Sequence, residues 1–242
     1  MSYCVVKKGF VFVGTIHMVL FLLSLAVSLS GCLPTRIPAG VNYVGGTVVT
    51  TLSSNVSLSY ATPDRSVSGN GFLMFKKPDN MRVVILSPFG SVLQEIYVSG
   101  ELITIIDSGN GIAFTGTHTD LPAKGDFSGW RYINWLIDID PPDPSHRTVS
   151  VQRINKFGES EKADFENGML ISKRTEAAGF VRYGEYADVQ GAPFPSNIGY
   201  ETAAGEKFTI TLEEPEINII LADSAFKPDL SKLRVYPLSV LK

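Results

Sequence analysis

The sequence predicts a mainly β protein of the α+β class, with the strands forming an antiparallel barrel or sandwich. Three observations support this class. Short apolar runs rich in β-branched residues follow one another with Gly- or Pro-containing turns between them. Only one segment, 126–139, combines helical spacing with a clear stop, and the 242 residues show neither an internal repeat nor a second core. A hydrophobic content of 44% also excludes a disordered chain.

The predicted strands begin after an ambiguous segment, 47–60. There Val48, Leu52, Val56 and Tyr60 have helical spacing, whereas Ser and Thr content favours a strand in the second half. Turn residues separate the later strands, and the acidic stretch 213–216 is interpreted as a solvated turn. The predicted strands are 71–75, 81–86, 92–98, 102–106, 112–117, 148–155, 161–166, 169–175, 180–186, 198–202, 207–212 and 217–221.

The predicted helix, 126–139, places Phe127, Trp130, Ile133 and Ile137 on one side, and Pro141 and Pro142 end it. Asp126 is the expected N-cap. We expect the helix to pack over an open end of the sheet and to bury two tryptophans. Its apolar side is also suited to lining a ligand cavity.

The N-terminal segment predicts export from the cytoplasm. Lys7 and Lys8 precede an uncharged apolar run, and the sequence 29–32 resembles the cleavage and acylation motif of bacterial lipoproteins. A retained membrane helix is the alternative. The only other cysteine, Cys4, would be removed with the signal peptide, so Cys32 could form no internal disulfide, and acylation would mask its thiol. Residue 33 is not Asp, which by the same resemblance implies the outer membrane.

The predicted domain plan has four parts: a signal peptide at 1–31, lipidated Cys32 with a tether to 46, a β domain at 47–221 and a C-terminal extension at 222–242. Removing residues 1–31, which carry two lysines and no acid, changes the formal charge from −3 to −5. A slightly acidic chain is poorly suited to binding a phosphate backbone, so no nucleic acid partner is expected.

A phenylalanine stands where turn chemistry normally places a polar residue. Phe89 lies between Pro88, which fixes one backbone dihedral, and Gly90, which frees another. The flanking runs 81–86 and 92–98 are predicted strands, so Phe89 lies at a hairpin tip. It either projects from the tip or folds back onto its own sheet.

No catalytic or metal-binding pattern is evident, and we expect neither enzymatic activity nor a cofactor. His118 and His146 are the only histidines after the predicted signal peptide, and no nucleophile elbow, phosphate loop or dinucleotide fingerprint occurs. Asp138, Asp140 and Asp143 could be considered for calcium. However, their spacing departs from a calcium loop and no glutamate closes it, so a solvated loop is preferred.

The segments 79–91 and 102–107 resemble the LolB family of outer-membrane lipoprotein receptors, whose wider group includes the soluble LolA carriers. The segment 130–139 resembles the helical part of that family, and 183–186, 193–198 and 207–212 resemble its closing strands. The family's helix before the first strand is weak or missing here, and the tail from residue 222 is additional.

The resemblance implies an incomplete antiparallel barrel, covered by a short helix, that encloses an apolar cavity. It implies a lipid-anchored protein on the periplasmic side of the outer membrane, expected as a monomer. Acylated lipoproteins would arrive from a soluble LolA-like periplasmic carrier, and the loop at Pro88, Phe89 and Gly90 would help insert them into the membrane. The alternatives are a lipid-binding or scaffold module of an envelope assembly and, more remotely, an esterase acting on envelope lipids.

Residues that line the cavity are predicted from the alternation along each strand, taking the charged side chain of a strand to mark its outer face. The helix contributes its apolar side. The predicted lining is Leu73, Phe75, Met81, Val83, Ile85, Val92, Ile96, Val98, Leu102, Ile106, Phe127, Trp130, Ile133 and Ile137.

Overall fold

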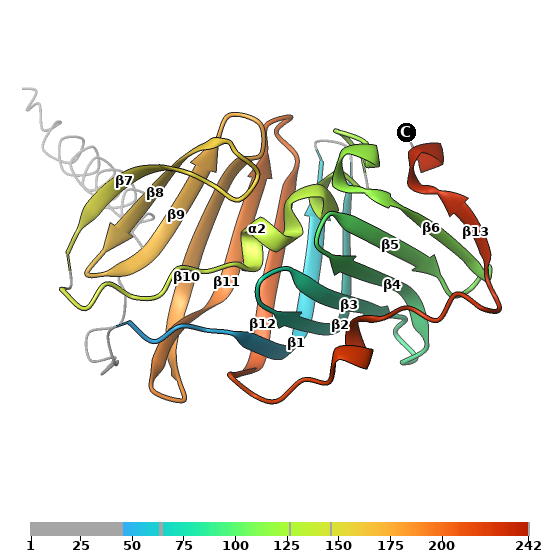
Figure 1. Ribbon diagram of the computed structural model, residues 1–242, viewed down its shortest axis with the longest axis horizontal. Helices are drawn as coiled ribbons and strands as arrows, with labels where there is room; N and C mark the ends of the chain where they lie inside the picture. Colours follow the sequence, from blue (N-terminus) through green and yellow to red (C-terminus); the bar gives the residue numbers. More distant parts are fainter. Residues whose placement is uncertain (1–45, 63–64, 126, 146, 242) are drawn as a thin grey trace, which may run out of the picture. The chain divides into compact units, whose positions relative to one another are not determined.

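The computed structural model describes residues 46–62, 65–125, 127–145 and 147–241, which belong to one compact unit (Figure 1). The predicted signal peptide, Cys32, most of the tether, the proposed N-cap Asp126 and His146 lie outside the described residues. Within the described ranges, no helix is long and apolar enough to cross a membrane. The described residues have their own hydrophobic core, so we expect them to fold without the first 45 residues.

The structure is dominated by one sheet of 13 strands in the order β13-β6-β5-β4-β3-β2-β1-β12-β11-β10-β9-β8-β7. Within the described residues, neighbouring strands are antiparallel, except that β13 and β6 are parallel. The two edge strands do not pair with each other, so the sheet curves without closing, and the predicted incomplete barrel is confirmed. The strands are β1 Thr51–Ala61, β2 Ser66–Lys76, β3 Asn80–Leu86, β4 Val92–Ser99, β5 Leu102–Asp107, β6 Ile112–Thr117, β7 Val149–Ile154, β8 Ser160–Glu166, β9 Met169–Thr175, β10 Gly179–Val189, β11 Ala192–Thr202, β12 Lys207–Ile217 and β13 Arg234–Pro237.

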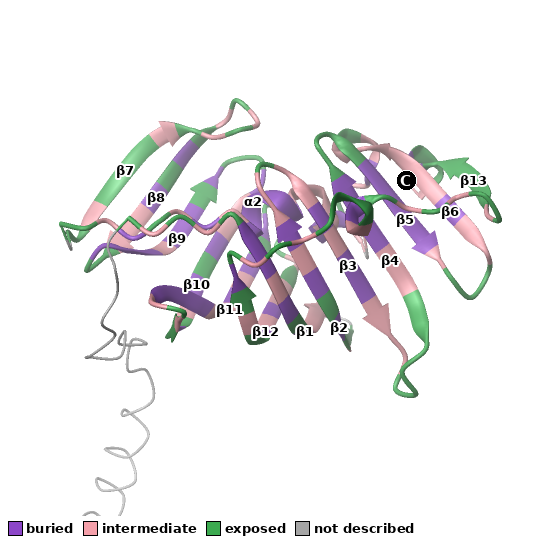
Figure 2. Cartoon of the chain, turned by 60° about the horizontal axis from the view of Figure 1, so that its bottom comes forward, coloured by how far each residue is buried: buried purple, intermediate pink, exposed green. Residues whose placement is uncertain are grey.

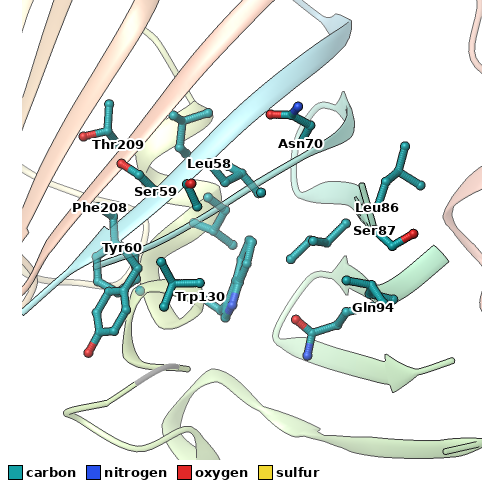
Figure 3. Close-up of a pocket in the computed structure, with 18 of the residues that line it drawn as sticks. Leu58, Ser59, Tyr60, Asn70, Leu86, Ser87, Gln94, Trp130, Phe208 and Thr209 are labelled. Carbon is teal, nitrogen blue, oxygen red and sulfur yellow. The ribbon is translucent and has the colours of Figure 1, made fainter. Parts of the chain in front are cut away.

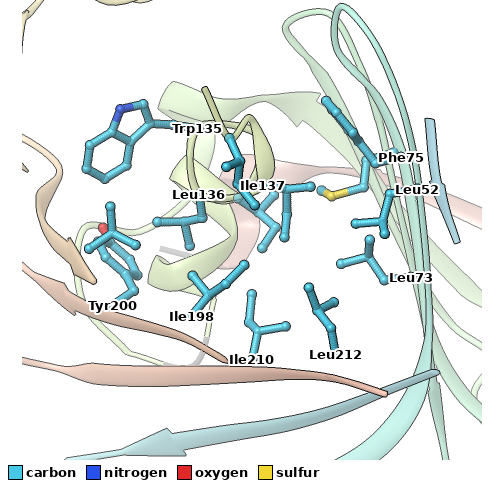
Figure 4. Close-up of a cluster of buried hydrophobic side chains, with 14 of the residues drawn as sticks. Leu52, Leu73, Phe75, Trp135, Leu136, Ile137, Ile198, Tyr200, Ile210 and Leu212 are labelled. Atoms are coloured by element: carbon cyan, nitrogen blue, oxygen red, sulfur yellow. The ribbon is translucent and has the colours of Figure 1, made fainter. Parts of the chain in front are cut away.

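The predicted helix is present as a 3₁₀ turn, η2 (Ser128–Tyr132), continued by α2 (Ile133–Ile137). All five residues of α2 are buried, because it packs against the sheet and forms the centre of the main core (Figure 4). The expectation that both tryptophans are buried is only half right: Trp135 is buried, whereas Trp130 is half-buried. The other short helices are η1 (His118–Asp120), η3 (Asp223–Phe226) and η4 (Leu238–Leu241).

Two clusters of buried side chains lie on the sheet. The main core contains α2 together with residues such as Leu52, Leu73 and Phe75. A smaller cluster contains Tyr97, Ile106 and Ala113, and Leu230 and Leu233 of the C-terminal segment pack against it. Residues 222–241 therefore pack onto the sheet and also supply β13 at its edge. Figure 2 shows the buried positions concentrated on the central strands, with β7 and β13 largely exposed.

The second cluster explains an error in the sequence prediction. Leu102 and Ile106 were expected on the inner face of the sheet, but Leu102 is 51% exposed and Ile106 belongs to the second cluster. Ile103 and Ile105 belong to the main core instead. No charged residue occurs within 102–106, so the rule that a charged side chain marks the outer face cannot identify the inner one here.

Two further predictions are wrong around β12. The stretch 213–216 is not a solvated turn, because β12 continues through it to Ile217. The pairing with β1 shifts register here and Glu214 has φ 50°, so the irregularity is a β-bulge. Consequently 217–221 is not a separate strand. The N-terminal half of β11, which contains Pro193 and Pro195, lies outside the strand predicted from the residue pattern, 198–202, although the family resemblance included 193–198 among the closing strands. This half pairs with β10 before the pairing of β11 with β12 starts at Asn197.

Candidate functional site

An apolar pocket of about 510 Å³ lies at one end of the central strands, where β1 and β3 end and where β2, β4 and β12 begin (Figure 3). The helical segment forms another wall. The strands contribute Leu58, Ser59, Tyr60, Val67, Ser68, Gly69, Asn70, Ile85, Leu86, Leu93, Gln94, Phe208, Thr209 and Ile210; the β3–β4 turn contributes Ser87 and Pro88, and the helical segment contributes Gly129, Trp130, Ile133 and Leu136.

Helical spacing explains the second wall. Trp130, Ile133 and Leu136 are three residues apart, so their side chains lie on one side of the η2–α2 segment. Gly129 allows this segment to approach β12 closely, because a Cβ at Gly129 would lie 2.5 Å from the ring of Phe208. Phe208 in turn packs against Tyr60, with ring centroids 4.6 Å apart.

The carboxylate of Glu206 joins three elements beside this wall. One oxygen accepts hydrogen bonds from the Tyr60 hydroxyl at 3.1 Å and from the Gly125 backbone N–H at 2.7 Å. The other accepts from the Ser128 hydroxyl at 2.6 Å. Partial burial opposes ionisation of Glu206, but the hydrogen bonds outweigh it and hold the pKa of this carboxyl below its ordinary value. Glu206 therefore ties the start of η2 to β1 and to the β11–β12 turn.

The pocket lining contains no Asp, Glu, Lys or Arg among the described residues. Its polar members carry hydroxyl or amide groups, and apolar and aromatic side chains supply much of the remaining surface. Arg65 lies outside the lining, with its guanidinium 5.9 Å from the Tyr60 ring, and Glu206 bonds to the hydroxyl of the same tyrosine. Charged residues of both signs therefore lie beside Tyr60, outside the lining. A pocket of this volume and character is suited to an apolar ligand.

The hairpin tip between β3 and β4 borders the pocket. Ser87 and Pro88 line the pocket, whereas the Phe89 side chain is 97% exposed and does not fold back onto the sheet. The Ser87 hydroxyl accepts hydrogen bonds from the backbone N–H groups of Phe89 and Ser91, and Gly90 has φ 81°. The tip is thus an ordered turn that presents an aromatic ring to solvent.

The predicted cavity residues fall into three groups. Ile85, Trp130 and Ile133 line the pocket. Leu73, Phe75, Met81, Val83, Ile96, Val98 and Ile137 belong to the main core, and Phe127 packs against it. Three residues, Val92, Leu102 and Ile106, belong to neither the pocket nor the main core. Val92 is 40% exposed.

Sequence reasoning missed most of the pocket because its walls come from distant segments. Tyr60 and Phe208 are direct partners in the β1–β12 pairing, although they are far apart in the chain. The alternation of Leu58 with Tyr60, and of Phe208 with Ile210, was visible in the sequence. It predicts a buried face but not which other strand that face meets.

A second, polar pocket of about 280 Å³ lies at the other end of α2. The buried Lys173 ammonium donates to the backbone carbonyls of Trp135 at 2.6 Å and Asp138 at 2.9 Å, which caps the end of the helix. Burial lowers the pKa of Lys173 to about 8 despite nearby carboxylates. The Trp135 indole N–H donates to Glu161, so this end of the helix is fixed by both charge and hydrogen bonds.

The acidic residues considered for calcium are used in separate ion pairs. Asp138 lies 3.0 Å from the Lys77 ammonium, Asp140 forms a two-pronged pair with Arg153, and Asp143 pairs with Arg147. No group of three or more potential metal ligands occurs among the residues that the structure describes.

Comparison with known proteins identifies the fold. Neither protein-family models nor curated proteins give a match. Among solved structures, the chain is similar to a DUF1329 family protein from Desulfovibrio piger (10% identity, TM-score 0.57, 74% of this chain and 90% of that one). It is also similar to a LolA superfamily protein from Nitrosomonas europaea, with 15% identity, a TM-score of 0.52 and coverage of 80% of this chain and 93% of that one. A third similar structure is a putative outer membrane lipoprotein-sorting protein domain from Vibrio parahaemolyticus, with 6% identity, a TM-score of 0.53 and coverage of 74% of this chain and 89% of that one.

At these identities the similarity establishes the fold alone. The chain shares its fold with these three solved structures, which agrees with the fold that the sequence resemblance implies. It does not separate LolB-like receptors from other proteins with this fold.

Proposed function

We propose that this chain is an outer-membrane-anchored lipoprotein that accepts the acyl chains of other lipoproteins in its apolar pocket and helps to insert them into the membrane. The observation that carries the proposal is the uncharged pocket of about 510 Å³, which opens beside the exposed Phe89. The two features are neighbours, because Pro88 lines the pocket and Phe89 follows it in the same turn. No covalent step is required.

Binding would be driven by removal of the acyl chain from water, which is worth about 0.8 kcal/mol for each buried methylene. A soluble LolA-like periplasmic carrier is the proposed donor, and the outer membrane is the proposed acceptor. Acylated Cys32 would hold the receptor at that membrane, since stable anchoring needs more than a single acyl chain. Phe89 entering the bilayer would contribute only about 1.5–3 kcal/mol, enough to orient the pocket but not to anchor the protein.

The test is incorporation of a fluorescent triacylated lipoprotein into liposomes that carry the lipidated full chain. Phe89→Glu is expected to reduce incorporation at least about tenfold, because placing a carboxylate in hydrocarbon is unfavourable. Binding of the lipoprotein in solution should be unchanged, since Phe89 does not line the pocket.

Ile220→Glu is the matched control. Ile220 is fully exposed, and Ile219 beside it accepts a hydrogen bond from Thr51 at the start of β1, so it lies at the opposite end of the sheet from Phe89. Normal incorporation by Phe89→Glu, or an equal loss with Ile220→Glu, would contradict the proposed role of the tip. If lipoproteins remain correctly localised in cells depleted of this protein, a lipid-binding or scaffold role in an envelope assembly becomes the better explanation.

A further inference from the structure

We infer that the pocket is built for one acyl chain joined to an uncharged head group. This inference rests on the proposed function and narrows it. A cargo with several acyl chains would place a single chain in the pocket and leave the others outside. The inference follows from the size of the pocket, its extent across the sheet and the chemistry of its lining.

The volume of the pocket corresponds to one chain. If a methylene group is taken to occupy about 30 Å³, similar to a water molecule in the liquid, about 510 Å³ holds roughly 17 such groups. One chain of about 16 to 18 carbons therefore fills the pocket. Three chains of that length would need roughly three times the volume.

The width of the pocket across the sheet also corresponds to one acyl chain. The lining comes from five consecutive strands of the sheet, in the order β4-β3-β2-β1-β12. Neighbouring strands are about 4.8 Å apart, so the pocket crosses roughly 19 Å of sheet. One acyl chain spans half of a bilayer core that is about 30 Å thick, which is about 15 Å. A single extended chain therefore covers most of this width, about 15 Å of roughly 19 Å.

The lining favours an uncharged head group. The polar side chains of the lining include those of Ser59, Ser68, Asn70, Gln94 and Thr209, all of which are neutral hydrogen-bonding groups. A carboxylate or phosphate drawn into this lining would lose hydration without meeting a cation, which is unfavourable. The cations just outside the lining are Arg65, which lies against the Tyr60 ring, and Lys124, which interacts electrostatically with Glu206. Hydroxyl, ester or amide head groups fit this lining, and the amide of an N-acylated peptide belongs to that class.

The experiment titrates the chain 46–242 with monoacylglycerols of increasing length, below the concentrations at which they aggregate, and follows binding by calorimetry. The dissociation constant is expected to fall about fourfold for each added methylene and then to become constant near 16 to 18 carbons. Palmitate at neutral pH should bind at least about tenfold more weakly than monopalmitoylglycerol. Native mass spectrometry should show one ligand per protein.

A pocket-filling variant tests the assignment directly. Leu58→Trp should move the length at which affinity becomes constant to shorter chains, by roughly the six heavy atoms that tryptophan adds to leucine. Leu102→Trp is the control, because Leu102 is exposed on β5 and does not line the pocket. Its length dependence should match that of the wild type. Urea unfolding of both variants establishes that they are folded.

The possible failures are distinguishable. Tighter binding of dipalmitoylglycerol than of monopalmitoylglycerol, or equal binding of palmitate, would overturn the single-chain, neutral-head inference and leave the proposed function intact. An unchanged length dependence in folded Leu58→Trp would also overturn it. Absence of binding by every acyl compound, including a triacylated peptide, would overturn the proposed function itself.

Discussion

Removal of the Glu206 carboxylate should loosen the wall of the pocket. A hydrogen bond to a charged group contributes about 1.5–3 kcal/mol, and Glu206 accepts three from Tyr60, Gly125 and Ser128. Because Glu206 is only partly buried, solvent screens these interactions, and we expect a total of about 2–3 kcal/mol rather than their full sum. Glu206→Ala should lower the free energy of unfolding by that amount, and Glu206→Gln, which keeps one acceptor oxygen, by about 1 kcal/mol.

Loosening of this wall should increase the rate at which the pocket releases a ligand. Without the bonds to Gly125 and Ser128, the start of η2 is no longer tied to the β11–β12 turn, and Gly129 and Trp130 are freer to move away from Phe208. If the arrangement in which η2 packs against Phe208 loses about 1.4 kcal/mol of stability, its population falls tenfold relative to arrangements in which η2 has moved away. Dissociation of monopalmitoylglycerol from Glu206→Ala, measured by stopped-flow fluorescence, should therefore be about tenfold faster than from the wild type.

The pH dependence provides an independent check on the role of the ionised carboxylate. The pKa of Glu206 in the folded protein lies below the ordinary 4.5, so at low pH the unfolded chain takes up the proton first. The stabilisation is fully present above pH 4.5 and is lost as the pH falls through the folded-state pKa. The difference in stability between the wild type and Glu206→Gln should accordingly shrink below pH 4.5.

Glu201→Gln is the control, since Glu201 is exposed on the neighbouring strand β11. It should change neither the unfolding free energy nor the dissociation rate. If Glu206→Ala is destabilised but releases the ligand at the wild-type rate, then Glu206 contributes to folding without closing the pocket. An equal effect of Glu201→Gln would show that loss of surface charge explains both results.

Two further predictions concern the framework. Burial lowers the pKa of Lys173 to about 8, so between pH 8 and 10.5 the unfolded chain holds a proton that the folded protein has lost, and folding becomes more favourable with rising pH. In urea unfolding, the free energy of unfolding of the wild type should therefore increase by about 2 kcal/mol relative to that of Lys173→Met between about pH 7.5 and about pH 10. A difference between the two proteins that does not change with pH would contradict the lowered pKa of Lys173. Gly71→Ala places a Cβ 1.8 Å from the Val84 carbonyl oxygen and should cost at least about 3 kcal/mol. Gly184→Ala, where no heavy atom lies within 4 Å, should unfold at nearly the wild-type urea concentration, and equal effects would refute the steric explanation.

Alternation in the sequence identified the inner face of β3, where a charged residue marks the outer face. On β3, Arg82 separates Met81 from Val83, and both apolar residues are fully buried in the main core, as expected. On β5, Leu102 to Ile106 offers no such contrast, since Leu230 and Leu233 help to cover the second face. The segment that removes the contrast is more than a hundred residues away, so local pattern could not reveal it.

The sequence by itself determined the β class, the central helical segment and the turn that holds Phe89, because each depends on side-chain spacing and backbone preference within about a dozen residues. Tertiary structure decided that Phe89 projects into solvent and that Trp130, Tyr60 and Phe208 meet around one pocket. It also decided that Glu206 secures the wall of that pocket. These outcomes depend on the pairing of β1 with β12 and on the approach of η2 to them, which join residues that no local pattern relates.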